Sequence, residues 1–135
     1  MSDDYVSWSV DYSVGFDPID SQHKELVVMT NALFEKCTQG ASAADKTFMQ
    51  TIKKASDYAR IHFSDEEKYM QQAGFPNLRD HIKMHSDFLD SIINALQDFE
   101  SGKTAPIELA RFLKKWLLNH IAISDKEYAP YLTKL

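Results

Sequence analysis

The sequence predicts an all-α protein, an antiparallel up-down-up-down bundle of four helices with an N-terminal arm. Apolar side chains recur at spacings of three and four through four long segments, which is the period of one helix face. The glycines and prolines fall between these segments, where helices end and begin. No segment alternates apolar and polar residues for long enough to indicate a stable strand.

The chain of 135 residues is long enough for one domain with a buried core. We expect a single domain over 1–135, made of an arm over 1–16, helices over 17–39, 43–73, 77–101 and 105–123, and a C-terminal segment over 124–135. The arm alternates briefly around Trp8 and Tyr12, but a lone strand cannot form a sheet. We therefore expect the arm to pack along the bundle.

Each predicted helix is bounded by residues that favour helix ends. The start signals are Asp17 as N-cap with Pro18 after it, Ser42 with Asp45, Asn77, and Thr104 with Pro106. The stop signals are Gly40, the Gly74-Phe75-Pro76 turn, and Gly102. The apolar repeats therefore belong to four separate helices.

Composition excludes several classes of protein. A net charge of −5 argues against a nucleic-acid binder, which needs a basic face for phosphates. The single cysteine, Cys37, permits no intramolecular disulfide and indicates a reducing compartment. The acidic N-terminus lacks the apolar stretch of a secretory signal, and no apolar run approaches the ~18–20 residues of a membrane span. We expect a cytoplasmic protein.

Two pairs of polar residues share helix faces that a bundle turns inward. His81 and His85 are four residues apart, and so are His62 and Glu66, so each pair lies on one face of its helix. A buried glutamate without a partner is costly, so the inward position of Glu66 requires a cation.

The positions of the histidines along their helices indicate where that cation binds. In an antiparallel bundle, the starts of the first and third helices lie beside the ends of the second and fourth. The polar residues at those ends are His23, His62 with Glu66, His81 with His85, and His120. Five nitrogen donors exceed the three or four protein ligands of a zinc site, so the sequence predicts two metal ions.

Asp125 completes the set only if the fourth helix departs from α-helical geometry. Five residues after His120, it falls about 140° round an ideal helix, so the turn must widen or end there. Ser124 and Glu127 could cap a new short helix that aims Asp125 inward, and π-like turns occur at functional sites.

These motifs together resemble the ligand signature of the hemerythrin family. The matching pattern is His23, His62-x3-Glu66, His81-x3-His85 and His120-x4-Asp125. Single-domain bacterial members look similar in having Trp8 in the arm, Ile19-Asp20-x2-His23, His62-Phe63-x2-Glu66-Glu67 and Trp116-x3-His120-Ile121. The resemblance spans nearly the whole chain and shows no departure at a ligand position.

The resemblance implies a centre of two irons joined by a bridging oxide or hydroxide. The implied ligands of one iron are His81, His85 and His120, and those of the other are His23 and His62. Glu66 and Asp125 are each implied to bridge both irons. The iron that carries His23 and His62 then keeps an open octahedral position, at which O2 binds reversibly.

The same resemblance implies an apolar pocket on the O2 side of the centre. The matching residues are Leu26, Phe63, Trp116 and Ile121. A dry pocket gives bound O2 no external proton and no room for a second substrate, which favours reversible binding over oxidation chemistry. We therefore expect an oxygen-binding protein used for storage, delivery or scavenging, and no enzyme.

Two other functions stay open at this point. An oxygen or redox sensor is less favoured because the bundle fills the chain and leaves no output domain, although a separate partner protein could transmit the signal. The oligomeric state is also open. Turnover of peroxide or nitric oxide is disfavoured by the apolar pocket and by the lack of a spare acid–base residue.

Other metal and catalytic architectures are absent from the sequence. No glutamate has a histidine three residues later, as ferritin-like di-iron bundles require, and there is no His-Glu-x-x-His motif. No Ser-His-Asp set can be drawn without taking a histidine from the cluster.

Four further residues receive plainer interpretations. We expect Cys37 to be an inert thiol on an apolar seam. Asp65 and Glu67 are expected to point outward, on either side of an inward Glu66. Tyr128 is left between a hydrogen bond near the site and ordinary packing.

Overall fold

The computed structural model describes residues 6–39, 46–103 and 106–135. Its elements are the 3-10 turn η1 (Val10–Tyr12), the helices α1 (Asp17–Thr38), α2 (Lys46–Ala73), α3 (Leu78–Glu100) and α4 (Pro106–Asn119), the π turn η2 (His120–Ser124), and the short helix α5 (Asp125–Leu132). The described residues contain no strand. The all-helical bundle that the sequence predicts is confirmed.

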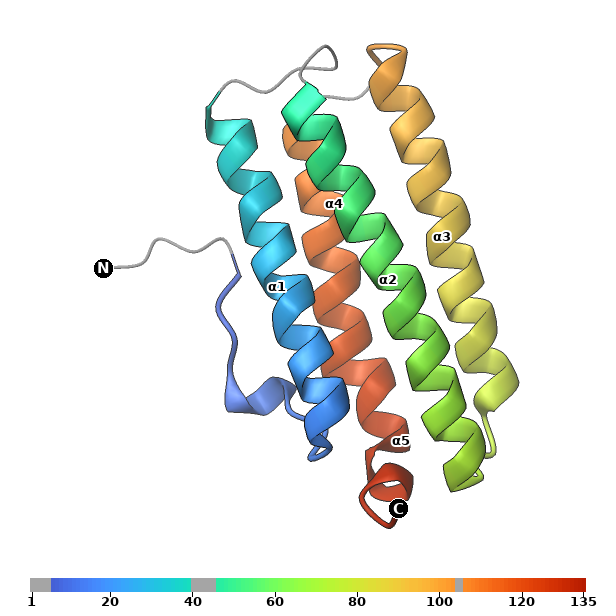
Figure 1. The fold of residues 1–135 in the computed structure, drawn as a ribbon. Coiled ribbons are helices and arrows are strands. Elements are labelled where there is room, and N and C mark those ends of the chain that lie inside the picture. The colour runs from blue at the N-terminus through green and yellow to red at the C-terminus, as the bar shows by residue number, and fades with distance from the viewer. Residues whose placement is uncertain (1–5, 40–45, 104–105) are drawn as a thin grey trace.

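The four long helices lie side by side, and each runs opposite to its neighbours in the chain (Figure 1). Helix α1 contacts α2 and α4, and α3 contacts the same two helices. The start of α1, the end of α2, the start of α3 and the end of α4 therefore share one end of the bundle, where α5 also lies. No described helix is long and apolar enough to cross a membrane.

The entry into α1 differs from the sequence-based expectation. Phe16, and not Asp17, is the N-cap, and its carbonyl oxygen accepts hydrogen bonds from the amides of Ile19 and Asp20 at 3.1 and 3.0 Å. The ring of Phe16 packs against Tyr69 on α2 with 4.9 Å between centroids. This contact holds Phe16 at the entry to the helix, one residue before Asp17, the expected N-cap. Asp17 is instead the first helical residue, where its charge complements the helix dipole.

The remaining boundaries lie close to the expected ones. Asn77 occupies the N-cap of α3 but makes no capping hydrogen bond with its side chain. Gly74 and Gly102 follow α2 and α3 with φ of 71° and 79°, a left-handed conformation that ends a helix readily only at glycine. The expected signals Gly40, Ser42, Asp45 and Thr104 lie outside the described residues.

Residues 6–16 lie along α1 (Figure 1). Asn31 fixes them by accepting a hydrogen bond from the Val6 amide at 2.7 Å and donating one to the Val6 carbonyl at 2.8 Å. Further along, the Lys24 ammonium sits 5.5 Å from the centroid of a Trp8 ring. The brief alternation in this segment gives one 3-10 turn and no strand.

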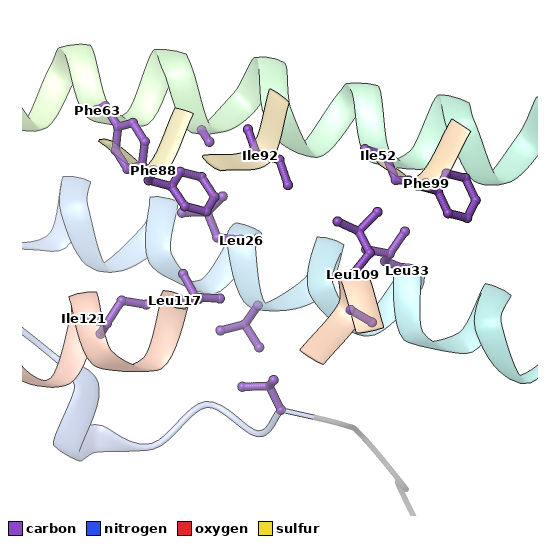
Figure 2. Close-up of a cluster of buried hydrophobic side chains, with 14 of the residues drawn as sticks. Leu26, Leu33, Ile52, Phe63, Phe88, Ile92, Phe99, Leu109, Leu117 and Ile121 are labelled. Carbon is purple, nitrogen blue, oxygen red and sulfur yellow. The ribbon is translucent and has the colours of Figure 1, made fainter. Parts of the chain in front are cut away.

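The apolar core is divided into two clusters. The larger fills the bundle from Phe63 and Ile121 at one end to Leu33, Ile52 and Phe99 at the other (Figure 2). The smaller closes the end that α5 covers, and its buried members are Val14, Ile19, Met70, Phe75, Tyr128 and Leu132. At about 1.5–3 kcal/mol for each large apolar side chain buried, both clusters stabilise the bundle.

Candidate metal centre

Seven polar side chains meet at the histidine-bearing end of the bundle. They are His23 from α1, His62 and Glu66 from α2, His81 and His85 from α3, His120 from the start of η2, and Asp125 from the start of α5. None of the seven is more than 3% exposed. The structure therefore brings together every ligand residue named from the sequence.

A π turn places Asp125 in this set. The Asp125 amide donates a hydrogen bond to the carbonyl of His120, five residues earlier. The widened turn leaves the Asp125 carboxylate 2.9 Å from the His120 Nε2 atom. The sequence left two possibilities, a turn that widens or a helix that ends, and the structure has the widened turn. The Ser124 side chain makes no capping hydrogen bond.

The two oxygens of Glu66 face different histidines. Oε1 lies 3.1 Å from the Nε2 atoms of His81 and His85 and 3.3 Å from that of His120. Oε2 lies 2.9 Å from Nε2 of His62 and 3.4 Å from that of His23. One carboxylate thus contacts all five imidazoles and divides them into a group of three and a group of two.

Asp125 spans the same two groups. Its Oδ1 atom lies 2.9 Å from Nε2 of both His81 and His120, and its Oδ2 atom lies 2.9 Å from Nε2 of His23. Each carboxylate therefore presents one oxygen to each group of histidines. This is the arrangement of two carboxylates that bridge a pair of cations.

The donor atoms fit two octahedral metal ions. Ligands that lie ~2.1 Å from an octahedral ion are about 3 Å from one another, and the contacts above cluster around that separation. Among the described residues, the buried atoms His23 Nε2, His62 Nε2 and Asp125 Oδ2 also lack a hydrogen-bond partner of good geometry. Imidazole nitrogens together with carboxylate oxygens are ligands for transition-metal ions, iron among them.

Without metal, the charges in the cluster stabilise one another. Burial lowers the pKa of His23, His81 and His120, but the close carboxylates of Asp125 and Glu66 outweigh burial and raise each pKa to about 9. Burial raises the pKa of both carboxyls, yet the surrounding imidazoles hold the pKa of Glu66 and of Asp125 below the usual values. The site is therefore a set of compensating buried charges.

His62 behaves differently from these three histidines. Burial lowers its pKa below the usual 6.5, and the charge interaction with Glu66 only partly offsets that effect. The cluster therefore favours the neutral form of the His62 imidazole.

Three side chains outside the ligand set hold ligands in place. Glu67 lies 2.8 Å from His85 Nδ1 through one carboxylate oxygen, so the expectation that Glu67 points outward is wrong. Gln22 lies 2.8 Å from His62 Nδ1 through its amide oxygen, and its amide nitrogen donates to Asp65 at 2.8 Å. Asp65 is likewise half-buried rather than outward.

Besides Glu67 and Gln22, the third side chain that holds a ligand in place is Tyr128. Its hydroxyl donates to Glu66 Oε2 at 3.0 Å. The sequence left two interpretations of Tyr128, a hydrogen bond near the site or ordinary packing, and this contact shows that the hydrogen bond is correct. Burial, with the charges of Asp125 and Glu66, holds the pKa of Tyr128 well above 10, so the hydroxyl keeps its proton. Sequence analysis did not find Gln22, because its spacing on α1 carries no sign of a partner on α2.

Aromatic side chains cover the other face of the histidines. Phe63 stacks on His85 with 4.0 Å between centroids and 9° between planes, and Trp116 stacks on His120 at 4.5 Å and 16°. These two rings and Leu26 line an apolar cavity of about 40 Å³. Ile121, the fourth residue expected at the pocket, is fully buried but does not line this cavity.

The chain is similar to known proteins along most of its length. Residues 14–132 match the model of the hemerythrin HHE cation binding domain. A bacteriohemerythrin from Stenotrophomonas maltophilia is 34% identical over 122 residues, covering 90% of this chain and 78% of the relative. A hemerythrin-like protein from Naegleria gruberi is 29% identical over 122 residues, covering 90% of this chain and 89% of the relative.

A solved structure supports the same assignment. The crystal structure of a wild-type hemerythrin superimposes with a TM-score of 0.85 at 25% identity, and the match covers 96% of this chain and 98% of the other. The family model spans far more than half of the sequence, and the same fold returns in that structure. The chain therefore belongs to the hemerythrin family.

Proposed function

We propose that this protein binds O2 reversibly at a non-haem di-iron centre and serves in oxygen storage, delivery or scavenging, without enzymatic turnover. The proposal depends chiefly on one observation, the unequal division of histidines by two bridging carboxylates. A pair of ferrous ions held there would supply a reversible two-electron reservoir for O2.

The unequal division leaves room for a ligand on one side only. The group of His81, His85 and His120 receives three nitrogens and two carboxylate oxygens, whereas the group of His23 and His62 receives two nitrogens and two oxygens. If one oxide or hydroxide bridges both ions, six-coordination is complete in the first group. The second group would then hold its ion with one protein ligand fewer, which would leave room for O2 there.

The surrounding side chains favour release over reaction. Leu26, Phe63 and Trp116 form an apolar wall beside the histidines and carry no group that protonates a bound ligand at neutral pH. The Tyr128 hydroxyl is engaged with Glu66 and belongs to the smaller cluster at the α5 end. Proton delivery, which oxidation chemistry at such a centre requires, therefore has no evident donor among these residues.

The test is an optical spectrum of the iron-loaded protein under three conditions. Anaerobic ferrous protein should be nearly colourless, should gain a charge-transfer band in air, and should lose it when O2 is removed. The exposed substitution Glu100→Gln at the far end of α3 provides a control with the same behaviour. A band that persists after O2 removal, or catalytic consumption of peroxide, would contradict reversible binding.

A further inference from the structure

Two histidines of the centre are each supported from behind by a side chain that belongs to neither group of ligands. The Nδ1 atom of His62 lies 2.8 Å from the amide oxygen of Gln22, and the Nδ1 atom of His85 lies 2.8 Å from a carboxylate oxygen of Glu67. In the part of the chain that the structure describes, the buried Nδ1 atoms of His23 and His120 have no such partner. Each group of histidines thus contains one ligand with a side-chain support.

The orientation of the Gln22 amide is fixed by Asp65. A carboxylate accepts hydrogen bonds and cannot donate them, so the atom of Gln22 that lies 2.8 Å from Asp65 Oδ2 must be the amide nitrogen. The amide oxygen then faces His62 and accepts a hydrogen bond from Nδ1–H. That proton position leaves the lone pair of His62 on Nε2, the atom directed at Glu66 and the metal position.

Glu67 fixes His85 in the same way with a different charge. Its carboxylate accepts from Nδ1–H of His85 and so leaves the lone pair on Nε2, which faces Glu66 Oε1. Glu67 side-chain exposure is 28%, so the carboxylate reaches the histidine from the rim of the bundle while the imidazole stays at 2%. A carboxylate partner makes an imidazole a stronger electron donor than an amide partner does.

We propose that Gln22 and Glu67 are positioning residues that support the two metal positions unequally. Glu67 brings a negative charge to the position held by three histidines, and Gln22, oriented by Asp65, brings a neutral dipole to the position held by two. The supported histidine at the position with two histidines, His62, is thereby a weaker electron donor than His85 at the other position. This inference rests on the metal binding in the proposed function and adds the residues that set its asymmetry.

Two conservative changes remove or move a negative charge without removing the hydrogen bonds. Glu67→Gln keeps an oxygen that accepts from His85 and removes the negative charge. The double variant Gln22→Glu with Asp65→Asn keeps the connection from residue 65 through residue 22 to His62 and leaves the net charge of the chain unchanged. It moves the negative charge from the second residue behind His62 to the first.

The experiment measures the midpoint potential and the rate of ferrous iron loss to a chelator in the iron-loaded protein. Glu67→Gln should raise the potential, and Gln22→Glu with Asp65→Asn should lower it, with iron loss within a few-fold of the unmodified protein in both cases. Glu67→Ala and Gln22→Ala should weaken iron binding by roughly 10–100-fold, the usual effect of losing an outer partner of a ligand. Glu100→Gln and Gln72→Glu, exposed charge changes on α3 and α2, are the matched controls.

The outcomes separate this inference from the proposed function. Unmodified protein that does not load two irons overturns both. Normal loading of the unmodified protein with potentials that stay at control values in both conservative variants overturns only the unequal support. Shifts of the same sign in the two variants also overturn it, because the charge moves away from the centre in one variant and toward it in the other.

Discussion

The hydroxyl of Tyr128 donates a hydrogen bond to Oε2 of Glu66 across 3.0 Å, and both side chains are 0% exposed. Tyr128 belongs to α5, so the short C-terminal helix is connected directly to the carboxylate that contacts all five imidazoles. The helix therefore takes part in the centre as well as closing the end of the bundle.

Replacing Tyr128 by Phe should lower the free energy of unfolding by about 1.5–3 kcal/mol, the usual worth of a hydrogen bond to a charged group. The ring and its packing in the smaller cluster are kept, so the loss reports the hydroxyl. Chemical denaturation of the metal-free protein measures it. Tyr131→Phe, on the same helix and half-buried, is the control and should cost well under half as much.

Replacing Glu66 by Ala should abolish stable loading of two irons per chain. The change removes both oxygens that face the histidine groups and leaves five buried imidazoles facing one another. Elemental analysis after reconstitution with ferrous iron is the measurement. The neighbouring Glu67 contacts His85 and so is unsuitable as a control, whereas the exposed Gln72→Ala on α2 is suitable. Equal iron in the Glu66 and Gln72 variants would refute the bridging role of Glu66.

The metal-free protein should be most stable at mildly acidic pH. Partners raise the pKa of His23, His81 and His120 to about 9, so the stability they contribute is complete below 6.5 and is lost as the pH rises through about 9. The lowered pKa of Glu66 and of Asp125 gives a contribution that is present above the usual carboxyl range and lost as the pH falls. The lowered pKa of His62 also disfavours the folded state in acid, in the same sense as the carboxyls.

Urea unfolding of metal-free protein across this pH range measures the effect. Protein loaded with metal should show the opposite trend between about pH 6 and about pH 9, because protons compete with metal for the same imidazoles. Metal-free stability that increases steadily from mildly acidic to alkaline pH would contradict the charge compensation described for the site.

Removing the metal should loosen the histidine-bearing end of the bundle before the other end. Metal removal takes away the bonds that would hold ligands from four helices together at one end, whereas the other end is sealed by buried side chains such as Leu33, Ile52, Ile92 and Phe99, with Leu113 packed against them. Hydrogen exchange on metal-free and metal-loaded protein measures the difference along each helix. Equal acceleration from end to end would show that the metal does not stabilise its own end preferentially.

Replacing Ile121 by Glu or His should shorten the lifetime of bound O2. Ile121 directly follows the ligand His120 and is fully buried, so the new side chain introduces an ionisable group into a dry core. Proton delivery of this kind typically accelerates a reaction by ~10²–10⁴, so autoxidation should become faster. If the new side chain coordinates the metal instead, it should block O2 binding. Decay of the absorption band in air is the measurement, with Ile123→Glu, at an exposed position, as the control. An unchanged lifetime would place the protection with Leu26, Phe63 or Trp116.

The sequence predicts the helices and the meeting of the five histidines with Glu66 because both follow from periodicity and from the order of the helices. His62 and Glu66, or His81 and His85, share a face whenever their segment is helical, and the antiparallel order of the helices brings those faces together. For Asp125 the spacing shows only that the helix must widen or end if its carboxylate is to join the set, since five residues do not return to the same face of an α-helix.

The residues behind the ligands depend on contacts between helices, which spacing does not encode. Gln22 meets His62 across the interface of α1 and α2, and Glu67 reaches His85 on α3 although its own position on α2 is half exposed. The N-cap of α1 was missed for a similar reason, because Phe16 is held by a ring on α2 and not by local capping chemistry. Local pattern thus identifies the donors, whereas tertiary packing decides what orients them.

The π turn at His120–Ser124 also bears on how the length of such a chain can change. A π turn is an α-helix with one inserted residue, so deleting one residue within it restores the regular period and leaves the side chains beyond it in phase. Removing the exposed Ile123 would leave the aspartate four residues after His120, the spacing by which His62 and Glu66 already share a face. A one-residue deletion within α4 would instead rotate everything beyond it by about 100°. Along the stretch from α4 to α5, a one-residue deletion therefore disturbs the structure least when it falls within this turn.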